Sequence, residues 1–590
     1  MRPPPAGGPA EPADPDPYRL RRRALVGGLA GTGLAAAVLL KLRGGSSTDV
    51  VTPPPPDPVE RAAAVRARDA GGFASRDESF ARSVGEPATP PPSAAPSTLF
   101  PTAGAAAANT RVTVPTILAT DDPAMHLLRR MAFGPTQAMV DEVHAKGIDA
   151  WLAEQLDPGS IPDGEAEGVA GLFPLATMAP SQIRGSMERF SWDAMMQFGQ
   201  ATMARQIWSQ RQLFEVMVDF WADHVHVATP GEGGWDVGPS FHNDVIRRHA
   251  LGSFTDMLLA ATRHPAMLRY LTNDDNHKDS VNENLGRELL ELHTVGVASG
   301  YTEDDVRNSA YILTGRTVAG EMDERGEEGT FVWDPDSHWT GAVRVLDFTH
   351  DNASADGGLD VGDAYVRYLA AHPSTARTIG RKLAVRFVAD DPPKALVDRL
   401  AQAFVDSGTQ ITPVLDVMLR SGEFWAAVGQ KVKRPLENLV SSVRVLGVRP
   451  GGDTKKVVEN LYWSAGQMGH RPLAWPAPNG YPDVHAAWRS ANGLLEVWNA
   501  HRGLVQGWNE GLTYTAPDQL IGDRPRGTVG EYVDSLCLRL CFQTFQGAHR
   551  DALIAFTGAG ADTPTADTDL AASVHHLAPL VLDAPYFALR

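Results

Sequence analysis

The chain has 590 residues, is acidic overall, and has almost no cysteine, which together exclude several classes of protein. Lysine and arginine number 53 against 71 aspartate and glutamate, so the formal net charge is −18 at pH 7. Because no long basic run offsets this charge, a nucleic-acid partner is not expected. The two cysteines, Cys537 and Cys541, exclude a disulfide framework and are expected to be small buried apolar residues.

The first 43 residues have the layout of an export signal. Arginines at 19 and 21–23 precede an apolar run rich in glycine and alanine, residues 24–40. Consecutive arginines before a weakly hydrophobic run are typical of the twin-arginine type of signal. The run is barely long enough to cross a bilayer, and no clear cleavage site follows it. We therefore predict an extracytoplasmic protein that is either anchored in the membrane by this segment or secreted.

Residues 44–120 are dominated by proline, alanine, serine, glycine and threonine, as in TPPPPDP and ATPPPSAAPS. A segment so poor in large apolar side chains cannot bury enough surface to order itself. We predict a disordered linker that would hold the folded part away from the membrane.

From residue 121 to residue 590 the sequence has the period of amphipathic helices. Apolar residues recur every three or four positions, broken at glycine and proline, without sustained β alternation. We predict one large, mainly α, multi-helix globular domain. Residues 321–361 are the exception, because alternating apolar and aromatic residues predict a short β-hairpin or irregular excursion there. Residues 476–483, PAPNGYPD, predict a tight loop.

The densest group of polar side chains falls in residues 282–296, NENLGRELLELHTVG. We predict a helix that begins with a capping box between Ser280 and Glu283 and stops at Gly296. At about 100° per residue, the leucines and His293 occupy one side of this helix. The other side is a polar face formed by Glu283, Asn284, Arg287, Glu288 and Glu291. This face is the predicted centre of function.

Several interpretations of the polar face remain open. On a wet surface, Glu283–Arg287 and Arg287–Glu291 would be ordinary ion pairs one helical turn apart. If the face is buried, Arg287 could be held by Glu283 and Glu291 in a structural network, within a scaffold for a partner protein.

Catalysis is the alternative to a scaffold. An extracytoplasmic hydrolase acting on an extracellular or cell-wall substrate would pair a carboxylate of this face with a second carboxylate from elsewhere in the chain, namely Asp223, Asp304 or Asp483. The candidate catalytic residues are Asn284, Arg287, Glu288, Glu291 and His293. The candidate substrate-binding residues, all in the predicted loop, are Asn479, Tyr481 and Asp483.

A divalent metal could also take part. Imidazole and carboxylate ligands suit zinc, manganese or iron, and the candidate ligands are His224, Glu288 and Glu291. The H-E-x-x-H pattern of zinc peptidases is not present in the sequence.

Several strings along the chain resemble one bacterial family. In order they are HLLRRMAFGPT, FWADHVHV, ATRHPAMLRYL, NENLGRELLELHTVGVASGYTEDDV, HPSTARTIGRKLAVRFV, KRPLENLVSSVRVLG, PNGYPD and APYFALR. Together they are similar to the family known as domain of unknown function 1800, over residues 121–590. The resemblance implies a helical fold, export, and a co-exported partner from a second family of unknown function, 1501. It implies no particular reaction. His224 matches the family's F-W-x-x-H-F pattern, whereas Val225 and His226 depart from it.

Overall fold

The computed structural model describes residues 120–590 except 509–511, 514 and 516–518. The chain divides into two units, Met1–Ala107 and Ala108–Arg590, and every described residue belongs to the second. The predicted export signal, and the predicted linker up to residue 119, lie outside the described residues. Within the described part, we find no helix with the length and apolarity that crossing a bilayer requires.

Helices dominate the described chain, and this confirms the predicted mainly α fold. The first helices are separated at Gly134 and Gly147, which both have a positive φ that glycine adopts more readily than other residues. Asp122 and Thr136 cap two of them by accepting backbone N–H groups. These helices are α5 (Pro123–Met131), α6 (Gln137–Lys146), α7 (Ile148–Leu156), α8 (Gly164–Ala170) and α9 (Pro180–Ser186).

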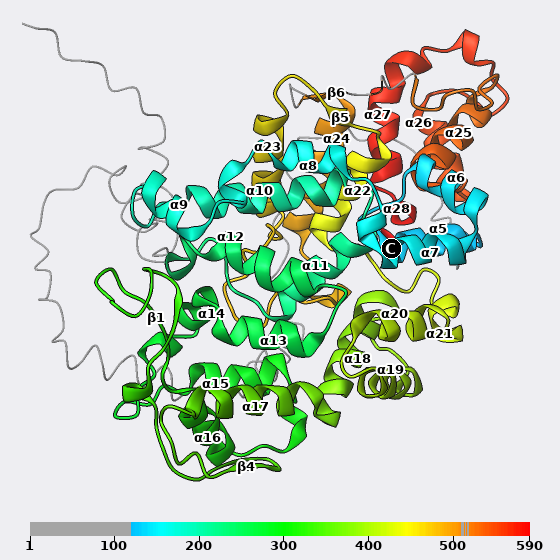
Figure 1. Ribbon diagram of the computed structural model, residues 1–590. Helices are drawn as coiled ribbons and strands as arrows, with labels where there is room; N and C mark the ends of the chain where they lie inside the picture. The colour runs from blue at the N-terminus through cyan, green and yellow to red at the C-terminus, as the bar shows by residue number, and fades with distance from the viewer. Residues whose placement is uncertain (1–119, 509–511, 514, 516–518) are drawn as a thin grey trace, which may run out of the picture. The chain divides into compact units, whose positions relative to one another are not determined.

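Three mostly buried helices run through the core (Figure 1). They are α10 (Asp193–Trp208), α11 (Gln212–His224) and α22 (Pro435–Val445). Every residue of α22 is buried, as expected of a helix packed on all sides. Buried indoles join this core to its surroundings, since Nε1 of Trp208 donates to the carbonyl of Val448 and Nε1 of Trp221 to that of Ala250.

Residues 238–371, green in Figure 1, form a helical group with two small hairpins. Its helices are α12 (Gly238–Phe241), a π-helical segment (His242–Arg247), α13 (Phe254–Arg263), α14 (Pro265–Tyr270), α15 (Asn284–Glu288), a π-helical turn (Leu289–His293), α16 (Glu303–Leu313) and α17 (Gly358–Ala371). The antiparallel hairpins pair β1 (Arg316–Val318) with β2 (Phe331–Trp333) and β3 (Val343–Val345) with β4 (Phe348–His350). They lie in and beside the predicted excursion at 321–361.

Helix α18 (Pro373–Phe387) starts after His372, whose Nδ1 accepts the N–H of Ser374. Its Gly380 permits close packing on α19, because a Cβ there would lie 3.2 Å from the backbone nitrogen of Ala401. The helices that follow are α19 (Lys394–Asp406), α20 (Ile411–Leu419) and α21 (Gly422–Ala426). With one side of α18 packed on α19, Lys382 and Arg386 contact residues of α11.

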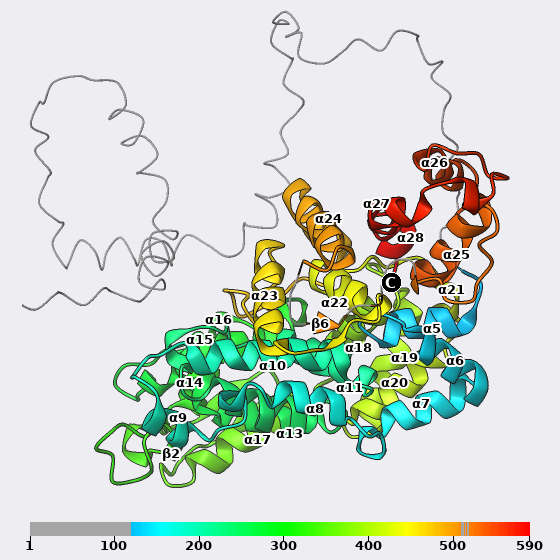
Figure 2. The same cartoon turned by 90° about the horizontal axis from the view of Figure 1, so that it is seen from above.

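The C-terminal helices lie beside the N-terminal ones, and Figures 1 and 2 agree in showing α5 and α6 next to α25. Arg129 of α5 donates to the carbonyl of Cys541 at 3.1 Å. Cys541 and Cys537 are buried and unbonded, as predicted. The elements of this part are β5 (Arg449–Pro450), α23 (Thr454–Gln467), α24 (Ala491–Val505), β6 (Leu512–Thr513), α25 (Val529–Cys541), α26 (Ala548–Phe556), α27 (Leu570–Leu582) and α28 (Pro585–Ala588).

Candidate functional site

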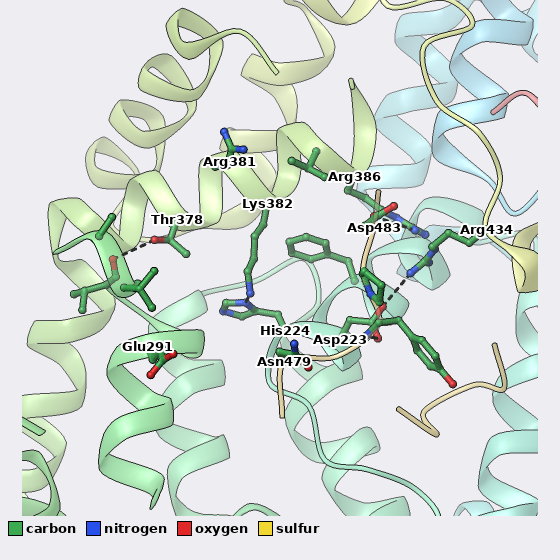
Figure 3. A pocket seen from close by; sticks show the side chains of 18 residues that line it. Asp223, His224, Glu291, Thr378, Arg381, Lys382, Arg386, Arg434, Asn479 and Asp483 are labelled. Atoms are coloured by element: carbon green, nitrogen blue, oxygen red, sulfur yellow. Dashed lines mark hydrogen bonds and ion pairs between the residues drawn. The ribbon is translucent and has the colours of Figure 1, made fainter. Parts of the chain in front are cut away.

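A cavity of about 530 Å³ lies between α11, α18 and the loop 479–483 (Figure 3). Phe220, Val295 and Val385 give it apolar walls. Its charged side chains are Asp223, Glu291, Arg381, Lys382, Arg386, Arg434 and Asp483. The volume of this cavity falls within the range of small-molecule sites, although its lining carries more charged side chains than such sites usually do.

Lys382 and His224 meet inside this cavity (Figure 3). Nζ of Lys382 lies 2.8 Å from Nδ1 of His224, and Nε2 of His224 lies 3.1 Å from the carbonyl oxygen of His293. An ammonium group can only donate, so Nδ1 accepts and Nε2 carries the proton. The imidazole is therefore neutral and fixed in one tautomer.

Burial sets the protonation of both groups. Burial, and then the nearby Lys382, lower the pKa of His224 well below its usual range. Burial also lowers the pKa of Lys382 to about 8, although Asp223 favours the ammonium form. A fraction of Lys382 is therefore an unprotonated amine near neutral pH.

Two arginines of the cavity lining, Arg386 and Arg434, belong to a network of buried ion pairs centred on Glu437, which is not itself part of the lining. Its Oε1 lies 2.6 Å from Arg386, 3.2 Å from Arg434 and 3.0 Å from Arg590. Burial alone would raise the pKa of Glu437, but these guanidinium groups hold it well below its usual range. Glu437 is therefore a carboxylate at neutral pH.

Asp219, Asp223 and Asp483 complete the network. Asp219 Oδ2 contacts Arg434 at 2.5 Å and Arg386 at 3.2 Å, and Asp223 contacts Arg434 at 3.1 Å. Burial and the neighbouring Asp219 raise the pKa of Asp223 to about 7, against the attraction of Arg434. Arg386 and Arg434 are thus already neutralised by protein carboxylates.

The predicted loop is fastened to α11 by its backbone. The N–H of Tyr481 donates to Asp223 Oδ1 at 3.1 Å, and Gly480 has a φ of +67°. A Cβ at Gly480 would lie 2.1 Å from the carbonyl oxygen of Asp223, so only glycine fits without movement. Lys431 holds the far side by donating to the carbonyl of Asp483 at 2.7 Å.

The three predicted substrate-binding residues all line the cavity, but most of their polar atoms are engaged. Asp483 pairs with Arg386 at 3.3 Å, and Tyr481 donates its hydroxyl to the carbonyl of Arg471. The side-chain Oδ1 of Asn479 accepts a hydrogen bond from Nε1 of Trp475. The loop therefore shapes the cavity more than it offers free donors to a ligand.

The central helix differs from the prediction at its start. Ser280 pairs with His277 in a bridge, α15 begins at Asn284, and Glu283 at its N-cap makes no capping hydrogen bond. The predicted capping box is therefore wrong. A π-helical turn then carries the chain to His293, three residues before Gly296.

The polar face of this helix lies at the surface. Arg287 pairs with Glu283 at 3.1 Å and with Glu303 at 2.6 Å, so its second partner is Glu303 and not Glu291 as predicted. Asn284 is exposed and donates to the hydroxyl of Thr272. The ordinary surface interpretation of these ion pairs fits this arrangement.

Two acids of the helix occupy different places. Glu291 lines the cavity and accepts a long hydrogen bond, 3.4 Å, from Tyr301. Glu288 is half-buried outside the cavity lining, and burial and then Glu291 raise its pKa to about 7. His293 is buried and contributes its backbone carbonyl to His224, while its Nε2 makes no hydrogen bond.

The predicted metal ligands are not brought together. His224 has both ring nitrogens engaged, and Glu288 lies outside the cavity lining that contains His224 and Glu291. Within the described ranges, no three histidine, cysteine, aspartate or glutamate side chains are grouped to hold an ion. The donor set predicted for a divalent metal is not assembled.

Sequence reasoning missed the residues that dominate the site: Lys382, Arg386, Arg434, Glu437 and Arg590. One signal was available for Arg386. It follows Ile379 and Leu383 on the apolar stripe of α18 and is 1% exposed. A charged residue at a core position needs buried partners.

Residues 126–589 match the model of the family described as Protein of unknown function (DUF1800). The match covers most of the chain, so the chain belongs to this family, as its resemblance indicated. No curated protein and no solved structure matches the chain.

Proposed function

We propose that this protein is exported and that its cavity binds a small organic anion with an apolar body. One observation carries the ligand class. Of the four cations that line the cavity, Arg386 and Arg434 are neutralised by carboxylates, whereas Arg381 and Lys382 have no carboxylate of the described residues within 4 Å.

The shape of the cavity supports the apolar half of this ligand. Phe220, Val295 and Val385 line it, and its volume of about 530 Å³ falls within the range of small-molecule sites. A ligand whose anionic end reaches Lys382 would place its body against these side chains. Burying that body supplies affinity, and the cations supply selectivity.

A matched pair of probes tests the proposal. 3-Phenylpropionate and 3-phenylpropionamide differ mainly in charge, and isothermal titration calorimetry on the full chain measures both. We expect the acid to bind at least about tenfold more tightly, a difference of roughly 1.4 kcal/mol. Lys382→Met and Arg381→Ala should remove this preference, whereas Lys394→Met, which changes an exposed lysine of α19, should not. Equal affinity of the two probes for the wild-type chain would overturn the proposal.

Export rests on the arginines and the apolar run in residues 1–43. Replacing Arg21, Arg22 and Arg23 by lysine should leave the protein in the cytoplasm, as cell fractionation would reveal. Unchanged export would contradict a twin-arginine route.

The hydrolase alternative has less support. Asp223 and Asp483 line the cavity together with Glu291, but Asp223 is paired with Arg434 and Asp483 with Arg386. The scaffold role and the co-exported partner of family 1501 stay predictions, and co-purification from the native host tests them.

A further inference from the structure

The amine of Lys382 combines three features that seldom occur together in one lysine. It reaches from α18 into a cavity large enough for a ligand (Figure 3). No carboxylate of the described residues lies within 4 Å of it. Its contacts are the neutral Nδ1 of His224 at 2.8 Å and the carbonyl oxygen of Leu292 at 3.4 Å, and neither can carry a compensating negative charge.

Two other lysines, Lys431, which is buried, and Lys433, which is half-buried like Lys382, provide a comparison. Lys431 is paired with Asp390 at 2.7 Å. Lys433 lies over the ring of Phe587 and donates to Ser441, in a space of only about 10 Å³. Lys431 is neutralised and Lys433 has no room for a reactant, whereas Lys382 has an unpaired amine and an adjoining cavity.

We infer that Lys382 reacts covalently with the carbonyl group of an aldehyde or ketone bound in the cavity, forming a Schiff base. The inference rests on the proposed function, because it places the reactant in the same cavity. An oxo acid fits both proposals, with its carbonyl carbon at Lys382 Nζ and its carboxylate toward the other cations of the cavity lining.

The step is balanced without an oxidant or a reductant. The nitrogen lone pair of the unprotonated amine attacks the carbonyl carbon, and the π electron pair moves to oxygen. A proton passes from nitrogen to oxygen to give the carbinolamine. The C–O bond then breaks and the hydroxyl leaves with one further proton as water, so that amine plus carbonyl gives imine plus water.

The amount of reactive amine supports this chemistry. Since burial lowers the pKa of Lys382 to about 8, roughly a tenth of the amine is unprotonated at pH 7. An exposed lysine with a pKa near 10.4 has a fraction roughly two-hundredfold smaller. Lys394, which is exposed and paired with Asp398, serves as the reference for background reactivity.

Reductive trapping tests the inference. The full chain is incubated with phenylpyruvate, which adds a carbonyl to the phenylpropionate skeleton, and reduced with borohydride. Peptide mass spectrometry then locates the secondary amine. We expect modification of Lys382 at least about tenfold faster than that of Lys394, rising with pH to a midpoint near 8. Lys433 should stay unmodified.

Two variants keep the outcome interpretable. Lys382→Arg retains a cation but cannot form the imine, so it should bind 3-phenylpropionate and give no adduct on α18. Lys382→Met should give neither result, with circular dichroism reporting whether it folds.

Each outcome decides between the two proposals. If the wild-type chain prefers 3-phenylpropionate over its amide but Lys382 reacts no faster than Lys394, the covalent inference fails and the binding proposal stands. An adduct at Lys382 without any preference for the acid supports the covalent inference and rejects the anionic ligand. If neither is seen, both fail.

Discussion

Around Arg287, the carboxylates of Glu283 and Glu303 approach to 3.1 and 2.6 Å, and the three side chains are 34%, 36% and 72% exposed. Around Glu437, the guanidinium groups of Arg386 and Arg434 approach to 2.6 and 3.2 Å, and the three side chains are at most 4% exposed. The contact distances are similar in the two clusters. The two clusters differ in their exposure to solvent. At the surface, water screens the charges that remain when one partner is removed, whereas in the core the remaining charge is buried and uncompensated.

The largest expected effect comes from neutralising the centre of the buried cluster. Glu437→Gln keeps the shape of the side chain but leaves three arginines facing an amide. We expect a loss of about 3–5 kcal/mol in the free energy of unfolding, measured by urea denaturation. Glu303→Gln is the matched change in the surface cluster and should cost less than about 1 kcal/mol. Similar losses in both variants would show that burial does not separate the clusters.

The loop that packs on the buried cluster gives the next effect. Gly480→Ala adds a Cβ that would lie 2.1 Å from the carbonyl oxygen of Asp223, so the loop must shift and the cavity deform. Gly469→Ala also places alanine at a positive φ, +79°, but meets nothing within 4 Å. We expect about 1 kcal/mol of strain for Gly469→Ala, and a larger loss with weakened binding of 3-phenylpropionate for Gly480→Ala. Calorimetry showing equal binding by both variants would argue against the loop as a wall of the site.

The pH dependence of stability shows how strongly burial affects a charged group in the cavity, Lys382. Its pKa falls from 10.5 in the unfolded chain to about 8 in the folded protein, so between these values the unfolded state binds more protons. The contribution of Lys382 to stability should therefore rise with pH from about 8 to about 10.5. Lys382→Met removes it, so the stability of the wild-type chain relative to this variant should increase over that window in parallel urea titrations. A constant difference would mean that the amine titrates normally.

The smallest effect is expected in the surface cluster. Arg287→Ala breaks the pairs with Glu283 and Glu303, but both carboxylates regain water. We expect a change of no more than about 1 kcal/mol, reduced further in high salt. A loss as large as that of Glu437→Gln would restore the central helix as the organising element.

The helical fold could be predicted from the sequence because the period of apolar residues and the breaks at glycine and proline are local properties. The capping box failed because Ser280 is used in a turn with His277, an alternative that the same residues allow. The predicted polar face is only partly a cluster, because Arg287 pairs with Glu283 and with Glu303 of another helix, whereas Glu291 lines the cavity. The density of charge along the sequence does not reveal which of these side chains water reaches.

The buried cluster was beyond prediction for a different reason. Its partners are far apart along the chain, as with Arg434 and Asp219, which are separated by 215 positions. No local sequence pattern predicts contacts between such residues. Only the position of Arg386 on the apolar face of α18 indicated a buried charge. The cavity itself could be anticipated only in part, through His224, Glu291 and the loop.

The long separations within the Glu437 cluster bear on how the protein acquires its native state. Arg386 and Asp219 lie 167 positions apart, so neither charge meets its counterion until the intervening helices have docked. Contacts of such high sequence separation form late, because chain entropy must first be lost. We expect the core around α22 to be the last region to protect its amides in pulsed hydrogen exchange. A chain in which these helices have not yet docked would leave the charges of the Glu437 cluster unpaired and open to water. If the protein is exported folded, as proposed, these exposed charges would distinguish an incompletely folded chain from the native one.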